Sequence, residues 1–105
     1  MNSKISDFQA RCYELLQQVP RGKVTTYSEI ARALGTTACR AVGTAMAKNR
    51  DLQTIPCYRV VKSDGDIGEY ALGRETKAGL LLDDGVIVRR GRIADLDSYL
   101  YRFDT

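Results

Sequence analysis

Histidine and tryptophan are both missing from this sequence. Without histidine the chain cannot form a Cys–His protease pair, so any reactive thiol must be activated in another way. Cysteine is scarce, and Cys12, Cys39 and Cys57 lie far apart in the chain. An odd number of widely spaced cysteines argues against a disulfide framework and favours a reducing compartment. Because no Cys-x-x-Cys pair exists either, we expect no metal site and no cofactor.

Long apolar stretches are also missing. No segment approaches the ~18 apolar residues of a membrane-spanning helix, and the N-terminus has no signal-peptide pattern. We therefore expect a cytoplasmic protein, or a nuclear one in a eukaryote, that does not associate with membranes. A length of 105 residues predicts a single domain over residues 1–105 with one core.

The positive charge is unevenly distributed. The net charge is +3, but residues 19–62 carry eight Lys or Arg against two acids, a local balance of +6. A basic block on a mildly acidic remainder indicates either a face that binds phosphates or an ordinary solvated basic surface.

Apolar residues recur at helical spacing near the N-terminus. The positions are Ile5, Phe8, Cys12, Leu15, Leu16 and Val19. They predict a helix that has ended by Pro20, with Cys12 as a small core residue rather than a reagent.

A helix-turn-helix follows. Thr26 and Glu29 form a Thr-x-x-Glu capping box that opens a helix reaching Leu34, and Gly35 suits its left-handed C-terminal end. A second helix is predicted to start after Thr36 or Thr37 and to run to about Asn49. Two short helices joined by a glycine-containing turn are typical of the helix-turn-helix motif.

The rest of the chain alternates short strands, turns and helices. We expect a strand–turn unit over residues 60–67, a helix over 74–82 and a hairpin over 86–93. Helical spacing returns at Leu96, Tyr99, Leu100 and Phe103. The predicted fold class is mostly α with small β elements, a winged helix-turn-helix DNA-binding domain.

The second helix of the motif is slim. Its small residues are Ala38, Ala41, Gly43, Ala45 and Ala47. Such a helix either packs tightly against another helix or enters a groove of DNA.

Cys57 is the candidate nucleophile. It lies in the segment Ile-Pro-Cys-Tyr-Arg-Val, residues 55–60, directly after Pro56. Proline fixes its own φ and would hold the cysteine rigidly, and a thiolate attacks sp³ carbon readily. The alternative is that Cys57 is an ordinary buried cysteine.

Five sequence blocks occur in the order of a known family. They are Gly-Lys-Val-Thr-Thr-Tyr (22–27), Cys-Arg-Ala-Val-Gly (39–43), Asn49, residues 55–61 and Gly-Glu-Tyr (68–70). Together they resemble the C-terminal DNA-binding domain of the O6-alkylguanine-DNA alkyltransferases, the methylated-DNA–protein-cysteine methyltransferases. The resemblance runs from about residue 8 to residue 87, and the larger N-terminal domain of many members is expected to be absent. The small alkyltransferase-like proteins, which bind damage without repairing it, are equally short.

The resemblance implies that the damaged guanine rotates out of the duplex and that Cys57 takes its alkyl group irreversibly. Arg40, on the slim helix with Ala41 and Gly43, would fill the space left by the base. Tyr27 would press on the 3′ phosphate. On the residues alone, Arg40 could instead form a surface ion pair, and Tyr27 could be a core aromatic.

Four further residues match positions of the family. Asn49 would link the recognition helix to the active-site turn, although it could equally cap that helix. Tyr70 belongs to the loop that closes over the base, and Val60 would contact the guanine through its backbone. Arg59 is expected to support the fold by an internal ion pair.

The pattern departs from active family members at one critical point. The residue after the cysteine is normally a histidine that relays the thiol proton through water, oriented by a glutamate. Here Tyr58 and Asp84 occupy these two positions. A neutral phenol, with a pKa of about 10 against about 6.5 for imidazole, is a poor proton acceptor near pH 7. Arg59 or a helix N-terminus could activate the thiol instead, and alkyl transfer is expected to be slow.

Three hypotheses remain. The first is single-turnover repair of double-stranded DNA containing O6-alkylguanine, approached from the minor groove by a monomer. The second is a non-catalytic sensor that binds the lesion and hands it to downstream repair proteins. The third is a winged-helix transcription factor, which would need long base-reading side chains where this helix carries alanines.

Overall fold

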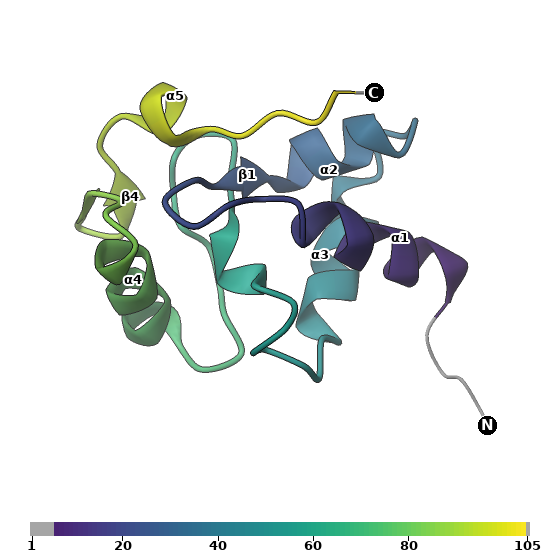
Figure 1. The fold of residues 1–105 in the computed structure, drawn as a ribbon, viewed down its shortest axis with the longest axis horizontal. Helices are drawn as coiled ribbons and strands as arrows, with labels where there is room; N and C mark the ends of the chain where they lie inside the picture. The colour runs from purple at the N-terminus through teal and green to yellow at the C-terminus, as the bar shows by residue number, and fades with distance from the viewer. Residues whose placement is uncertain (1–5, 105) are drawn as a thin grey trace.

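The computed structural model describes residues 6–104 and confirms a mostly helical chain with small β elements (Figure 1). Its helices are α1 (Asp7–Leu16), α2 (Tyr27–Ala33), α3 (Cys39–Ala47), the 3₁₀ turn η1 (Cys57–Arg59), α4 (Arg74–Asp83) and α5 (Leu96–Tyr99). Its strands are β1 (Thr25–Thr26), β2 (Val60–Val61), β3 (Val88–Arg89) and β4 (Arg92–Ile93). The helix over 74–82 and the hairpin over 86–93 were both predicted. The first helix ends at Leu16, earlier than the pattern suggested, and Ile5 lies outside the described residues.

The capping box is half formed. The Thr26 hydroxyl accepts a hydrogen bond from the Glu29 backbone N–H at 2.9 Å, as the motif predicts for the start of α2. The Glu29 carboxylate binds elsewhere, accepting from Arg32 and from the backbone N–H of Phe103. Gly35 has the predicted positive φ of +76° at the end of α2.

Two apolar clusters meet at the short parallel pair β1–β2. This pair has the register Thr25↔Val60 and Thr26↔Val61. Successive strand residues point to opposite faces, so Val60 packs with α1, α2 and α3, and Val61 packs with α4 and β4. The helix-turn-helix thus lies at one end of the molecule, and α4 with the β3–β4 hairpin lies at the other (Figure 1).

The C-terminal segment is less helical than the spacing of its apolar residues predicts. Only Leu96–Tyr99 is helical, and Leu100 forms a parallel bridge with Val24. The Val24 N–H donates to the carbonyl of Tyr99 at 2.9 Å, and the Tyr101 N–H donates to Val24 at 2.7 Å. The helical prediction for the second half was wrong because this pairing holds the chain extended. Phe103 is nevertheless buried, against the first cluster.

No helix formed by residues 6–104 has the length and apolar character needed to cross a membrane.

Candidate active site and nucleic-acid interface

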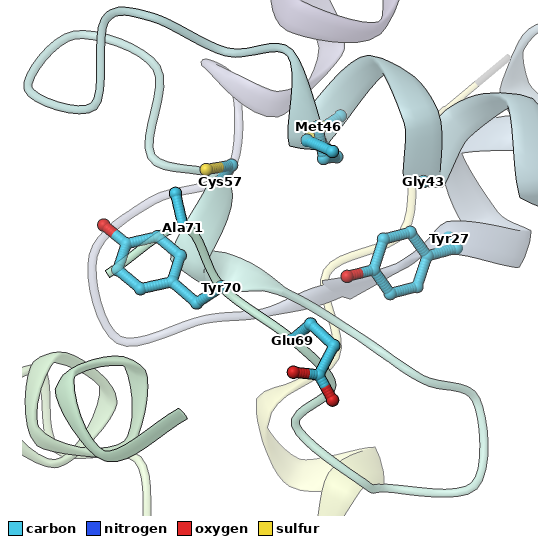
Figure 2. A pocket seen from close by; sticks show the side chains of 8 residues that line it. Tyr27, Gly43, Met46, Cys57, Glu69, Tyr70 and Ala71 are labelled. Carbon is cyan, nitrogen blue, oxygen red and sulfur yellow. The ribbon is translucent and has the colours of Figure 1, made fainter. Parts of the chain in front are cut away.

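The sulfur of Cys57 borders a cavity of about 140 Å³ between the helix-turn-helix and the loop before α4 (Figure 2). The lining residues are Tyr27, Gly43, Met46, Ala47, Cys57, Glu69, Tyr70 and Ala71. The Tyr27 hydroxyl points toward the middle of this group, whereas the Glu69 carboxylate points away from Cys57 (Figure 2). The cavity therefore combines a thiol, two phenol rings and the slim face of α3.

Cys57 opens the turn η1 directly after Pro56 and is only 6% exposed. Its N–H donates to the carbonyl of Ile55 at 2.8 Å, and Arg59 closes the turn by donating its N–H to Pro56 at 2.9 Å. This short, hydrogen-bonded turn holds the thiol in one place at the cavity wall.

Asn49 joins the end of α3 to this turn. Its side chain is buried, and Nδ2 donates to the carbonyl of Ile55 at 2.9 Å while Oδ1 accepts from the Asp51 N–H at 2.9 Å. Lys48, not Asn49, stands at the C-cap of α3. The structure thus places Asn49 between α3 and the segment that carries Cys57.

Tyr58 faces away from the cavity. Its hydroxyl donates to Asp84 Oδ2 at 2.5 Å and accepts from Arg59 Nε at 3.1 Å. Burial first, and then the hydrogen bond to Asp84, raise the pKa of Tyr58, so the phenol stays protonated near neutral pH. Tyr58 is therefore not placed to take a proton from Cys57.

Asp84, which accepts the hydrogen bond from Tyr58, also forms ion pairs with two arginines. Its carboxylate forms ion pairs with Arg21 at 3.0 Å and with Arg59 at 3.5 Å. Arg59 also donates from Nη1 to the carbonyl of Val19 at 2.9 Å. These contacts connect the Cys57 turn to the end of α4 and to the segment after α1.

Lys77 is a site residue that the sequence reasoning missed. Its side chain is 0% exposed, and Nζ donates to the carbonyls of Val60 at 2.7 Å and Glu69 at 3.0 Å. Burial lowers the pKa of Lys77 to about 8, and the attraction of an ionised Cys57 partly opposes this effect. The one sequence signal was its spacing, since Lys77 stands four residues before buried Leu81 on the same face of α4.

The two tyrosines of the cavity are hydrogen-bond donors at neutral pH. Burial, followed by the charge of an ionised Cys57, raises the pKa values of Tyr27 and Tyr70. Tyr27 is the first residue of α2, and Tyr70 lies in the loop between Gly68 and Gly73, both of which have positive φ. The Tyr27 phenol can thus donate to a polar ligand in the cavity, whereas the Tyr70 hydroxyl points away from Tyr27 (Figure 2).

The remaining predicted residues are not all gathered at the cavity. Gly43 lines it, but Ala41 borders a different hollow, beside α1. Arg40 is exposed on α3. Val60 is fully buried, its N–H donates to the carbonyl of Cys57, and its own carbonyl accepts from Lys77. The predicted backbone contact from Val60 to a guanine stays a prediction.

Within residues 6–104, no group of three or more His, Cys, Asp or Glu side chains could hold a metal ion.

Comparison with known proteins identifies one family. Residues 7–86 match the model of the 6-O-methylguanine DNA methyltransferase DNA-binding domain. A bifunctional methyltransferase/endonuclease from Picrophilus torridus is 44% identical over 99 residues, which is 93% of this chain but 32% of that protein. The chain therefore spans about a third of the length of this relative.

Two solved structures share the fold. Atl1 from S. pombe, crystallised with damaged DNA containing O6-carboxymethylguanine, superposes with a TM-score of 0.83 at 29% identity and covers 95% of this chain and 99% of its own. The O6-methylguanine-DNA methyltransferase from Pyrococcus kodakaraensis superposes with a TM-score of 0.71 at 46% identity, over 78% of this chain and 48% of that protein. These likenesses support the predicted winged helix-turn-helix class.

Proposed function

The chain belongs to the family of the 6-O-methylguanine DNA methyltransferase DNA-binding domain, and from this we propose that it repairs O6-alkylguanine in double-stranded DNA by taking the alkyl group onto Cys57. The observation that carries the proposal is the cavity in which Cys57, Tyr27 and Tyr70 meet beside the slim face of α3. A monomer would approach the minor groove through α3, with Arg40 entering the stack as the base rotates out.

The proposed reaction is a substitution at the alkyl carbon. The Cys57 sulfur forms a bond to this carbon while the bond from carbon to O6 breaks, and the electron pair of that bond stays with the guanine. In the net reaction the thiol proton is transferred to the guanine, which regains its normal N–H form. The product is a stable thioether, so each protein molecule reacts once.

Lys77 supports this reaction although the usual histidine is missing. A thiolate is the reactive form of cysteine, and a nearby cation favours the ionised sulfur electrostatically. Lys77 is fully buried, bonded to the carbonyls of Val60 and Glu69, and within electrostatic reach of Cys57. Arg59 cannot play this part as directly, since its guanidinium is engaged with Asp84, Tyr58 and Val19.

The second candidate function is a non-catalytic sensor of O6-alkylguanine. Two observations favour it: the likeness to Atl1 extends over nearly the full length of both chains, and Tyr58 points to Asp84 instead of to the cavity. On this reading the cavity holds the flipped base, Cys57 does not react, and another repair protein removes the lesion.

A restriction-site assay distinguishes the two functions, because it measures whether the methyl group has been removed from the DNA. A duplex with O6-methylguanine inside a recognition site resists cleavage until the methyl group is removed. We expect stoichiometric wild-type protein to restore cleavage and Cys57→Ser to leave it blocked while still binding the duplex. Tight binding by both proteins without restored cleavage would overturn repair and support the sensor.

A further inference from the structure

The β3–β4 hairpin exposes a pair of arginines. In its antiparallel register Val88 faces Ile93 and Arg89 faces Arg92. Residues directly opposite each other point to the same face of an antiparallel pair. Ile93 is buried and Val88 half-buried, so this pair faces the core, while Arg89 and Arg92 both face solvent.

The arrangement of these two charges is unfavourable within the protein. Like charges directly opposite each other destabilise a strand pair. Neither Arg89 nor Arg92 forms an ion pair with any carboxylate of residues 6–104. Arg92 donates only to a backbone carbonyl, that of Asp64, at 2.6 Å. The internal contacts of the hairpin therefore do not explain why two cations lie side by side.

Arg90, at the tip of the hairpin, adds a third cation in a strained conformation. Its φ is +53°, and it is the one non-glycine residue with positive φ among those described. Gly91 follows with a φ of +76°, so both central residues have the positive φ of a type I′ turn. Asn, Asp or Gly is preferred at the first of these positions, and a long side chain there costs about 1 kcal/mol or more. An arginine kept in such a position points to a use for its charge.

The hairpin lies beside the loop that lines the Cys57 cavity. The Gly91 carbonyl accepts from the Ile67 N–H at 3.0 Å. Arg74, packed against Gly91, donates to the carbonyl of Gly68 at 3.2 Å and pairs with Asp66 at 2.9 Å. Glu69, a lining residue of the cavity, follows Ile67 by two positions, which places the turn within roughly 10 Å of the cavity wall.

We propose that Arg89, Arg90 and Arg92 form a turn that binds the DNA backbone, contacting phosphates beside the base held at the Cys57 cavity. This inference rests on the proposed function, because it assumes that the cavity faces DNA. The matched family region ends at residue 86, so it does not include the hairpin. Three exposed guanidinium groups on a rigid turn fit the spaced phosphates of a duplex backbone, which they recognise without reading sequence.

The test measures DNA affinity against salt concentration. The logarithm of the DNA-binding constant falls linearly with the logarithm of the salt concentration, and each lost phosphate contact makes this slope shallower by about 0.9. We expect Arg89→Gln/Arg92→Gln to lower the slope by about 1.8 on duplexes with and without O6-methylguanine. Arg11→Gln, the loss of one exposed charge on α1, removes no hairpin contact and is the control; we expect it to lower the slope by less than either hairpin variant does.

Arg90→Asn distinguishes a loss of DNA binding from a loss of stability. Asparagine suits the positive φ, so we expect an unchanged or higher melting temperature together with a slope lowered by about 0.9. Slopes equal to wild type in both hairpin variants, with the proteins folded, would overturn the proposal. If wild-type protein left cleavage blocked in the restriction-site assay, the proposed repair function would fail, while the slope differences would still report on the hairpin.

Discussion

For the proposed transfer, Tyr58 and Lys77 are the two residues to compare with the histidine of active family members. Tyr58 occupies the sequence position of the base, but its hydroxyl is committed to Asp84. Lys77 is nineteen residues after Tyr58, yet its ammonium group lies between the carbonyls of Val60 and Glu69, beside the Cys57 turn. The structure offers a charge near Cys57 rather than a base, so we expect the proposed transfer to be slow.

Lys77→Met tests the role of that charge. At pH 7 we expect alkyl transfer at least about tenfold slower than in wild type, because the thiolate loses a neighbouring cation. Wild type itself loses this charge as the pH rises through about 8, the lowered pKa of Lys77, so the deficit should shrink at higher pH. Single-turnover rates from pH 6.5 to 9 check this. A deficit that is constant with pH in a folded variant would assign Lys77 a purely structural part.

Tyr58→His should accelerate transfer near neutral pH, because imidazole can accept the thiol proton where a phenol cannot. Tyr58→Phe is the matched control. It removes the hydroxyl bonded to Asp84 and should leave the transfer rate within about twofold while lowering stability by about 1–3 kcal/mol. Equal rates for Tyr58→His and wild type would show that proton removal does not limit the reaction.

Local signals predicted the elements of secondary structure well. The Thr26 cap, the positive φ of Gly35, the helix before Asp84 and the β3–β4 hairpin all follow from residues close in sequence. Contacts between distant elements could not be predicted in this way. Glu29 reads as the last residue of a capping box, but its carboxylate accepts from Phe103, 74 residues away. Lys77 has only its spacing from Leu81 as a sequence signal, and its burial depends on how α4 packs against the Cys57 turn.

Glu29 holds the C-terminal segment against α2. Its carboxylate is 5% exposed and binds Arg32 at 2.6 Å, the Phe103 N–H at 3.0 Å and Arg102 at 3.6 Å. The hydrogen bonds from Arg32 are the largest influence on the pKa of Glu29, which is lowered from its ordinary value. A carboxyl group with a lowered pKa stabilises the fold above its unfolded pKa, and this contribution is lost as the pH falls through the folded value.

We therefore expect Glu29→Gln to lower the free energy of unfolding by about 1–3 kcal/mol at pH 7. The difference from wild type should shrink as the pH falls from about 4.5, where Glu29 of the unfolded chain becomes protonated, through the lowered pKa of Glu29 in the folded protein. Urea unfolding at pH 7 and at pH 3.5 checks both statements. A difference that stays constant between these two pH values would contradict this account of the Glu29 cluster.

At the scale of the whole molecule, the reactive turn lies where two halves meet. The helix-turn-helix half brings Tyr27, Gly43 and Met46 to the cavity, and the loop leading into α4 brings Glu69, Tyr70 and Ala71 (Figure 2). The β1–β2 pair joins the two halves. Asn49 connects the segment before Cys57 to the helix-turn-helix half, and Lys77 connects the segment after it to α4. Each sequence block that carried the family resemblance contributes a residue to this junction, whereas the junction itself depends on packing across the chain.

The most direct test of the central claim is the intact mass of the protein after incubation with an excess of duplex DNA containing O6-methylguanine. Transfer to Cys57 predicts a gain of about 14 Da, one methyl group in place of a hydrogen, in a single step that saturates at one per molecule. The gain should be absent from Cys57→Ser and from wild type given unmodified DNA. An unchanged wild-type mass, under conditions in which the protein is bound to the damaged duplex, would contradict alkyl transfer.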